Sequence, residues 1–316
     1  MTSQPRIDWL KGRQSGIGGS EIAAIVGLSQ YRTPMHVWES KVNPVADEET
    51  SQPAYWGTVL EDVVAKEYAL RTGRKVQRLT KQMMHPDFNF AIANIDRAII
   101  NPDIAGRVFW KDGKLTTDRI LECKTANGFM AKQWGEVGSD QVPDSYLIQC
   151  QWYMGVTGAS ICDLAVLIGG QDFRIYTILR DDDLINDLLI QGAAFWELVQ
   201  SRTEPDPVNY PEAVKKWSKS DPSLSVQADD LLVDDLEQIQ SIKAQVKELE
   251  AQEDALKARV LLALESAETL LYQGVKVATC KTQTRTSFDA KAFEKDHPEL
   301  YAQYKKTSST RVLRII

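Results

Sequence analysis

Two charged residues, Glu122 and Lys124, alternate within an apolar stretch that reads as a β-strand. They lie in RILECKTANG (119–128), among isoleucine, leucine and cysteine. In a strand, residues at positions i and i+2 point to the same face of the sheet. A carboxylate and an ammonium side by side are either a structural ion pair or parts of one reactive cleft. A Glu-x-Lys pair is common by chance, so this pattern alone favours the ion pair.

A third charged residue, Asp96, occupies a similar position in FAIANIDRAII (90–100), which contains four isoleucines. A carboxylate within an apolar strand is costly unless it is paired or bound to a metal ion. The short connection between the two segments allows their strands to lie side by side, with Asp96 next to Glu122. The competing interpretation is an aspartate in a turn or bulge that pairs with Arg97 or Arg119. For Asp96 considered alone, that interpretation is slightly favoured.

Taken together, the three residues indicate a metal site. Two carboxylates at one point repel each other, and Mg²⁺ is the natural cation between them because it is a hard ion that takes oxygen ligands and retains waters. The carbonyl oxygen of Cys123 is a candidate third ligand, and Mn²⁺ is an alternative ion. Lys124 would orient or deprotonate a water held by the ion, and this water would attack a phosphodiester. The combination therefore favours hydrolytic chemistry over separate ion pairs.

A second candidate site, for an anion, lies in RQSGIGGSEIAAIVG (13–27). Three glycines, including Gly19, leave backbone N–H groups open before Ser20, which is predicted to be the N-cap of a short helix. A glycine-rich loop at a helix N-terminus can bind an anion, and Arg13 could add a bidentate contact to a phosphate. A plain N-cap role also explains Ser20, and the two roles are compatible.

The elements around these residues predict an α/β fold with a central mixed sheet flanked by helices. The turn KDGK (111–114) predicts a hairpin. Helical patterns cover 33–42, 55–73, 144–158 and 181–200, and strand-like segments cover 74–79, 89–100, 107–110, 115–124, 161–170 and 172–180.

The chain of 316 residues is long enough for one large domain and an appendage. TEPDPVNYPE (203–212) contains three prolines in ten residues and is predicted to be a linker. The expected domains are therefore residues 1–207, which contain the candidate sites, and a C-terminal region, 208–316.

The C-terminal region is predicted to contain one long helix and a small β element. Apolar residues recur at 3-4 spacing between 239 and 260, interrupted only by Glu253, which predicts a helix over about 230–266 with a coiled-coil-like stripe. This stripe could pack on its own domain or pair with a partner helix. Segments 270–281 and 310–316 alternate in polarity and are expected to pair as a terminal sheet.

Composition excludes several classes of protein. The chain is 43% hydrophobic and 26% charged, as in ordinary globular proteins, and no run of about 18 apolar residues predicts a membrane span. The N-terminus lacks the apolar core of a secretory signal. Four cysteines without a CxxC pair and three scattered histidines argue against a zinc site or an iron–sulfur cluster. Free thiols in a reducing cytosol are expected.

The formal net charge of −7 argues against a protein whose whole surface coats nucleic acid. Net charge describes solubility and long-range fields, and it does not describe a single cleft. A locally basic groove beside an acidic, cation-binding site therefore remains compatible with this composition.

The Asp…Glu-x-Lys pattern on two strands resembles the signature of the PD-(D/E)XK nuclease superfamily. A larger set of motifs resembles the YqaJ-type viral recombinase family, which is similar to lambda exonuclease. The resemblance covers roughly residues 10–200 and keeps the family's motif order, which is more specific than any single motif. In one departure, Ile95 replaces the proline that precedes the first acid in the superfamily. The segments are RQSGIGGSEIAAIVGLSQYRTPMHVWESKV (13–42), WGTVLEDVVAKEYALRTG (56–73), HPDFNFAIANIDRAI (85–99), LECKT (121–125) and YLIQCQWYMGVTG (146–158).

The resemblance implies a restriction-endonuclease-like core and a role for each matching residue. Asp96 and Glu122 resemble the principal metal ligands, together with the carbonyl of Cys123. Lys124 resembles the lysine that activates water. Arg13 and Ser20, with Gly19, would hold the terminal 5′-phosphate of the strand being degraded.

Two further roles are implied, each with a rival residue nearby. Glu61 resembles a helical acid that helps to hold a second metal, although its neighbour Asp62 belongs to the same acid-rich helix. Gln149 matches a glutamine near the scissile phosphate, and Gln151 is the alternative.

The activity implied by the resemblance is a Mg²⁺-dependent 5′→3′ exonuclease that acts on double-stranded DNA ends. Such an enzyme leaves a 3′ single strand for annealing-based recombination in a phage or prophage. The resemblance also implies a homo-oligomer, with a trimer favoured, and a single-strand annealing protein as partner.

Two alternatives stay open. The first is a RecB-like or Cas4-like repair nuclease, and the missing cysteine cluster argues against its cluster-bearing versions. The second is a protein that binds DNA ends without cleaving them. The presence of Asp96, Glu122 and Lys124 argues against the loss of cleavage.

Overall fold

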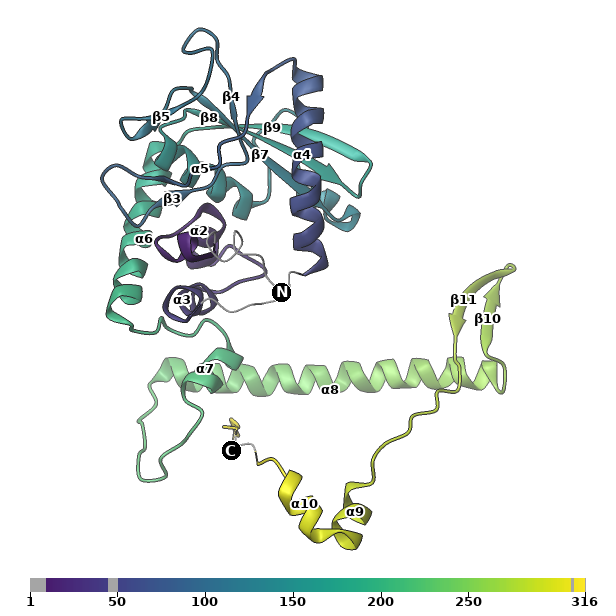
Figure 1. The fold of residues 1–316 in the computed structure, drawn as a ribbon. Helices are drawn as coiled ribbons and strands as arrows, with labels where there is room; N and C mark the ends of the chain where they lie inside the picture. The colour runs from purple at the N-terminus through teal and green to yellow at the C-terminus, as the bar shows by residue number, and fades with distance from the viewer. Residues whose placement is uncertain (1–9, 45–50, 308–309, 316) are drawn as a thin grey trace. The chain divides into compact units, whose positions relative to one another are not determined.

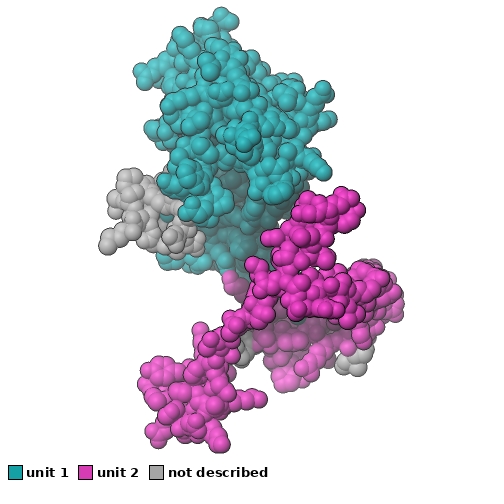
Figure 2. Space-filling model, turned by 90° about the vertical axis from the view of Figure 1, so that its right-hand side faces the viewer, with its two compact units in different colours: residues 1–212 teal, residues 213–316 magenta. Residues whose placement is uncertain are grey.

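A computed structural model describes residues 10–44, 51–307 and 310–315, and the chain divides into two compact units, Met1–Glu212 and Ala213–Ile316 (Figure 2). The expected boundary lay at residues 207 and 208. The first unit extends further because the buried carboxylate of Glu212 accepts hydrogen bonds from Thr33 Oγ1 (2.5 Å) and the N–H of Val208 (3.2 Å). These contacts attach the end of the proline-rich segment to the first unit.

A five-stranded mixed sheet forms the centre of the first unit, which confirms the predicted fold class (Figure 1). The strand order is β1-β4-β7-β8-β9. Strands β7 and β8 are parallel, and every other neighbouring pair is antiparallel. The strands are β1 (Val76–Gln77), β4 (Arg97–Ile99), β7 (Arg119–Ala126), β8 (Ile161–Ile168) and β9 (Asp172–Leu179).

Helices cover both faces of this sheet. Helix α4 (Gln52–Thr72) packs on one face, where Leu121 and Cys123 of β7 contribute to a small apolar cluster. Helix α5 (Asp144–Thr157) packs on the other face, against the larger core, to which Ile120 contributes. Because side chains alternate along a strand, Glu122 and Lys124 share the face of Ile120.

Three more helices pack behind α5, and two of them have side-chain N-caps. Helix α3 (Pro34–Val42) begins with Thr33, whose hydroxyl accepts the N–H of His36. Helix α6 (Asp182–Ser201) begins with Asp181, whose carboxylate accepts the N–H of Leu184 (3.0 Å). Such caps satisfy N–H groups that have no partner within the helix.

The prediction that Ser20 is the N-cap of the first short helix is wrong. Helix α2 (Gly19–Ile25) begins one residue before Ser20, and its N-cap is Gly18. The carboxylate of Glu21 accepts the N–H of Gly18 (2.9 Å), so a longer side chain from inside the first turn replaces the expected serine cap. The hydroxyl of Ser20 is thereby left for another contact.

Short pairs of strands and one 3₁₀ helix complete the first unit. The predicted KDGK hairpin is confirmed, with Asp112 and Gly113 both at positive φ, as a tight two-residue turn requires. The remaining elements are β2 (Met83–Met84), β3 (Ile92–Ala93), β5 (Trp110–Lys111), β6 (Lys114–Leu115) and η1 (Gly128–Gln133), which directly follows β7.

The second unit contains the predicted long helix, α8 (Asp230–Leu264), and a hairpin of β10 (Thr269–Tyr272) and β11 (Val275–Thr279). The expectation that residues 310–316 add a strand to this sheet is wrong for the described residues, 310–315, which form no strand. Strands β10 and β11 pair with each other across a short turn that contains Gly274 at positive φ. The other helices are α7 (Tyr210–Lys216), which spans the boundary, α9 (Ala290–Asp296) and α10 (Pro298–Tyr304).

Within the part of the chain that the structure describes, no helix is both long enough and apolar enough to cross a bilayer.

Candidate active site

A buried polar cluster lies where β7 meets α5. Lys124 Nζ lies 2.7 Å from Glu122 Oε1, and Gln149 Nε2 donates to the same oxygen at 2.6 Å. Lys124 Nζ also donates to Gln149 Oε1 (3.0 Å), and Gln149 Nε2 contacts the hydroxyl of Tyr153 (3.2 Å). Three predicted site residues are therefore in direct contact, and Tyr153 is an additional member that the sequence analysis missed.

The second oxygen of Glu122 has no partner. Glu122 is only 3% exposed, and its Oε2 is one of two buried side-chain polar atoms without a hydrogen bond among the described residues. An unpaired carboxylate oxygen removed from water is costly. A bound cation would satisfy it.

Asp96 joins this cluster from the neighbouring strand. It immediately precedes β4, and its Oδ2 accepts the backbone N–H of Cys123 (2.8 Å). The alternative in which the Asp96 carboxylate pairs with Arg97 or Arg119 is wrong, because Arg97 donates only to the backbone carbonyl of Asp96 (2.5 Å) and both arginines pair with other acids. Asp96, at the start of β4, and the Glu-x-Lys pair on the adjacent strand β7 thus come together, as the resemblance to PD-(D/E)XK nucleases predicts.

Glu61 approaches from α4, and the structure separates it from its rival, Asp62. Arg97 pairs with both, through Nη1 to Glu61 Oε1 (2.6 Å) and through Nη2 to Asp62 Oδ1 (2.9 Å). The side chain of Glu61 is 21% exposed, whereas that of Asp62 is 54% exposed. The charge of Glu61 also acts on both Asp96 and Glu122, so Glu61 is the acid closer to the cluster.

Gln151, the alternative to Gln149, takes a structural role. Its Nε2 donates to the carbonyl of Leu179 (2.7 Å), and its Oε1 accepts the N–H of Asp181 (3.0 Å). These bonds attach α5 to the connection between β9 and α6. Gln149 is therefore the glutamine of the candidate site.

The protonation of the cluster is set by burial and by mutual charge. Burial, followed by the charge of Glu122, raises the pKa of Asp96 well above its usual range. Burial also raises the pKa of Glu122, although Lys124 opposes this shift. Burial alone would lower the pKa of Lys124, but Glu122 and Asp96 outweigh it and raise that pKa. Lys124 is consequently an ammonium, and it acts here as a hydrogen-bond donor.

The donors of this site fit a hard divalent cation. Mg²⁺ is commonly held by one or two carboxylates together with waters. Asp96 and Glu122 supply two carboxylates, and Cys123, which directly follows Glu122, donates its backbone N–H to Asp96 Oδ2. The carbonyl of Cys123 stays a predicted third ligand. No group of three His, Cys, Asp or Glu side chains among the described residues forms a complete ligand set by itself. The unpartnered oxygen of Glu122 supports the fit.

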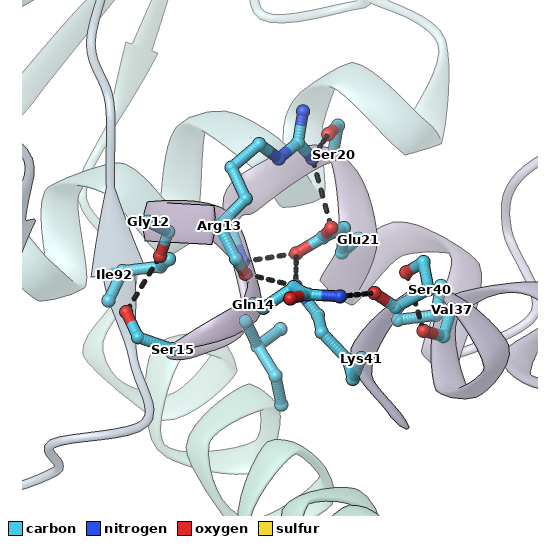
Figure 3. Close-up of polar contacts among 12 residues, drawn as sticks. Gly12, Arg13, Gln14, Ser15, Ser20, Glu21, Val37, Ser40, Lys41 and Ile92 are labelled. Carbon is cyan, nitrogen blue, oxygen red and sulfur yellow. Dashed lines mark hydrogen bonds and ion pairs between the residues drawn. The ribbon is translucent and has the colours of Figure 1, made fainter. Parts of the chain in front are cut away.

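The predicted anion site is a separate cluster of charges around Glu21 (Figure 3). Arg13 Nη2 donates to Ser20 Oγ (3.3 Å) and lies 3.0 Å from Glu21 Oε1. Lys41 Nζ lies 2.7 Å from Glu21 Oε2, and Arg32 Nη1 lies 3.9 Å from Oε1. All four charged residues line a cavity of about 620 Å³. Glu39 also lines the cavity, so three cations face two carboxylates and the charged lining keeps a net positive charge of one.

Glu21 orients this cluster. Burial opposes its ionisation, but the charges of Arg13 and Lys41 outweigh burial and lower the pKa of Glu21. The carboxylate therefore stays ionised and holds the Arg13 guanidinium over Ser20. Neither Glu21 nor Lys41 was predicted from the sequence as a site residue. The signal was present, because Lys41 lies on the apolar face of its helix, one turn after Val37 and Trp38.

Gly19 connects the two clusters through a close approach. A Cβ atom built on Gly19 would lie 2.6 Å from Tyr153 Cε1 and 2.9 Å from Gln149 Cγ. Only glycine lets α2 pack this closely on α5. Gln149 in turn contacts Glu122 and Lys124. Gly19 therefore lies next to Ser20 of the anion cluster in sequence and against Gln149 of the carboxylate cluster in space.

Comparison with known proteins identifies the family. Residues 8–160 match the family model described as a YqaJ-like viral recombinase domain. The chain is 32% identical over 314 residues to the YqaJ protein of Bacillus subtilis strain 168. The aligned region covers 97% of this chain and 92% of that protein. The chain therefore belongs to the YqaJ-like viral recombinase family, and the resemblance found in its motifs is confirmed.

Solved structures with a related arrangement include two exonucleases. An alkaline exonuclease from Laribacter hongkongensis is 19% identical, with a TM-score of 0.49, over 62% of this chain and 94% of that one. A phage-related exonuclease from Haemophilus somnus 129PT is 13% identical, with a TM-score of 0.42, over 59% of this chain and 96% of that one.

Proposed function

We propose that this protein is a Mg²⁺-dependent exonuclease that degrades one strand of double-stranded DNA in the 5′→3′ direction from its end. The observation that carries the proposal is the buried Glu122 carboxylate, which has one oxygen on Lys124 and the other without a partner. This arrangement lies beside an electropositive cavity. Membership of a viral recombinase family supports a role in DNA recombination.

Each residue of the carboxylate cluster has a defined task in this proposal. Asp96, Glu122 and the Cys123 carbonyl would hold the ion, with Glu61 close enough to help hold a second one. When bound, Mg²⁺ supplies charge neutralisation at the scissile phosphate and a more acidic water. Lys124 donates hydrogen bonds to the attacking water and fixes its position. Gln149 accepts a hydrogen bond from Lys124 and donates one to Glu122, which fixes the two charged groups relative to each other.

The electropositive cavity explains the proposed direction of degradation. A terminal 5′-phosphate would bind to Arg13 and Ser20, whose side chains already contact each other. A phosphate accepts several charge-assisted hydrogen bonds, and arginine donates them in a fixed fork. Because Gly19 lies against Gln149, an end held in this cavity places the next phosphodiester toward Lys124.

Assembly and partners belong to the same proposal. We expect a homo-oligomer, with a trimer favoured, and a single-strand annealing protein that receives the 3′ single strand. Family membership supports this part, and size measurement of the purified protein in solution tests the oligomeric state.

The activity is tested on linear duplex DNA labelled at its 3′ ends, with Mg²⁺, with Mn²⁺ or with EDTA. We expect nucleotide release only with a divalent ion, and shortening of each labelled strand from its 5′ end. Binding of DNA ends without release would instead support a non-catalytic end-binding protein. Degradation from the 3′ end would contradict the proposed direction.

Replacement of Arg13 by alanine is expected to remove most of the preference for a 5′-phosphate over a 5′-hydroxyl. Hydrogen bonds to charged groups contribute about 1.5–3 kcal/mol, so the preference should fall about tenfold to a hundredfold. The rates of digestion of the two kinds of end give this ratio. Arg107→Ala is the matched control, because Arg107 is exposed near a hairpin and contacts the ring of Phe109. Equal slowing on both ends by Arg13→Ala would point to a general defect.

A further inference from the structure

A large exposed aromatic residue, Tyr31, lies at the rim of the electropositive cavity. Its side chain is 76% exposed, although it belongs to a well-structured loop between α2 and α3. Ser29 Oγ accepts the backbone N–H groups of both Tyr31 and Arg32, each at 3.2 Å. The backbone of Tyr31 is thus fixed in a turn.

The position of Tyr31 connects the two clusters of the candidate site. Tyr31 lines the cavity together with Arg13. On its other side, its hydroxyl contacts Met130 Sδ (4.0 Å) on η1, which directly follows the strand of Lys124. Tyr31 therefore lies between the proposed phosphate cavity and the carboxylate cluster.

A second tyrosine, Tyr146, contacts Lys124 and interacts with Tyr31. Lys124 Nζ lies 5.0 Å from the centre of the Tyr146 ring. Burial raises the pKa of Tyr146, Lys124 opposes this shift, and the Tyr31 phenol adds to it. The two phenols are therefore close enough to interact, and one of them lies over the ammonium of the site.

We propose that the Tyr31 ring stacks on the base of the 5′-terminal nucleotide, the one that is about to be released. This inference rests on the proposed exonuclease function. When the terminal phosphate occupies the Arg13 cavity and the next phosphodiester lies at Lys124, the nucleoside between them must lie along the surface that Tyr31 lines. Its base has left the duplex stack and exposes an apolar face.

Stacking on one aromatic ring suits an enzyme that must accept every sequence. Each base has a π-face, so stacking tolerates any base and contributes about 1–3 kcal/mol per base. Tyr31 would thus replace part of the stacking energy that the terminal base loses when it leaves the duplex. It would also hold that nucleotide while its phosphodiester is positioned at Lys124.

The test compares two 5′-phosphorylated duplexes that differ only at the 5′-terminal nucleotide, which either carries a base or is abasic. The rate of loss of the first nucleotide in Mg²⁺ is measured on strands labelled at the 3′ end. Wild-type protein should remove the nucleotide with a base about tenfold faster. Tyr31→Ala should abolish this ratio by slowing only the duplex with the base, and Tyr31→Phe should restore it because the ring is retained.

Tyr304→Ala serves as the matched control, since Tyr304 is 77% exposed and belongs to the second unit. It should keep the wild-type ratio. A ratio that persists in Tyr31→Ala, or wild-type rates that are equal for the two duplexes, would overturn the stacking role while leaving the nuclease function in place. If wild-type protein shortened neither duplex, the proposed function would fail, and the stacking role would fail with it.

Discussion

Replacing Asp96 by asparagine is expected to slow Mg²⁺-dependent DNA degradation by about 10³-fold or more. Loss of one of two carboxylate ligands removes several kcal/mol of charge stabilisation, at about 1.4 kcal/mol for each factor of ten in rate. The fold should persist, because the amide oxygen of asparagine can still accept the N–H of Cys123. Nucleotide release from 5′-phosphorylated linear duplex DNA measures the effect.

The same substitution should stabilise the protein in EDTA. Burial and Glu122 raise the pKa of Asp96 in the folded state, so ionised Asp96 opposes folding at any pH above its unfolded value. Neutral asparagine removes this penalty. The melting temperature of Asp96→Asn should therefore exceed that of the wild type at neutral and alkaline pH. The difference should vanish as the pH falls below the usual pKa of aspartate, about 3.9.

Added Mg²⁺ should reverse the order. A ligand that binds only the folded state raises its stability, so Mg²⁺ should raise the melting temperature of the wild type and have little effect on Asp96→Asn. Asp103→Asn is the control, since Asp103 lies on an exposed turn shortly after β4. Equal responses to Mg²⁺ in the wild type and in Asp96→Asn would contradict the assignment of Asp96 as a ligand, whatever the effect on cleavage.

The carboxylate cluster could be predicted from the sequence because its geometry is local. Glu122 and Lys124 share a face through the two-residue period of a strand, and Asp96 reaches them through one antiparallel pairing. The apolar neighbours in both segments also made the three charges conspicuous. The roles of Gln149 and Glu61 could be predicted only from the resemblance to the family, because the sequence of a helix does not determine which strand residues the helix will contact.

The second cluster could be predicted only in part. Arg13 and Ser20 do contact each other, but the acid that orients them, Glu21, was not identified. Its partner Lys41 comes from a different helix, and their contact depends on how α2 and α3 pack. The incorrect N-cap at Ser20 has the same origin: a serine before a helix is the common cap, but here Glu21 already holds the N–H of Gly18.

Another buried carboxylate, that of Asp163 on β8, has no role in the proposed chemistry and stabilises the fold. Its side chain is fully buried on the α4 face of the sheet. Arg119 binds both of its oxygens (2.8 and 2.9 Å), and Arg74 and Thr177 donate at 3.2 and 3.0 Å. The hydroxyl of Tyr68 on α4 also donates to it. One carboxylate thus links α4 with three segments of the sheet.

Asp163→Asn is therefore expected to be among the most destabilising isosteric changes in the first unit. Removing one partner of a buried ion pair costs about 3–5 kcal/mol. Here the fully buried carboxylate is lost, and Arg119, whose side chain is 19% exposed, loses the charge that it pairs with. In a unit of this size, this cost corresponds to a fall of about 6–20 °C in melting temperature. Thermal unfolding followed by circular dichroism in EDTA measures the effect, and it keeps metal binding out of the comparison.

The chain provides a matched control in the same sheet. Asp172 Oδ2 accepts two hydrogen bonds from Arg174 (2.9 and 2.6 Å), so this pair is also an aspartate doubly bonded to an arginine, but at an exposed position. Water solvates exposed ion pairs, so Asp172→Asn should change the melting temperature little. If both substitutions lowered the melting temperature equally, the burial of Asp163 would not be the cause of its loss of stability. The carboxylate at 163 would then be replaceable, and the cohesion between α4 and the sheet would have to come from the apolar cluster around Leu121 alone.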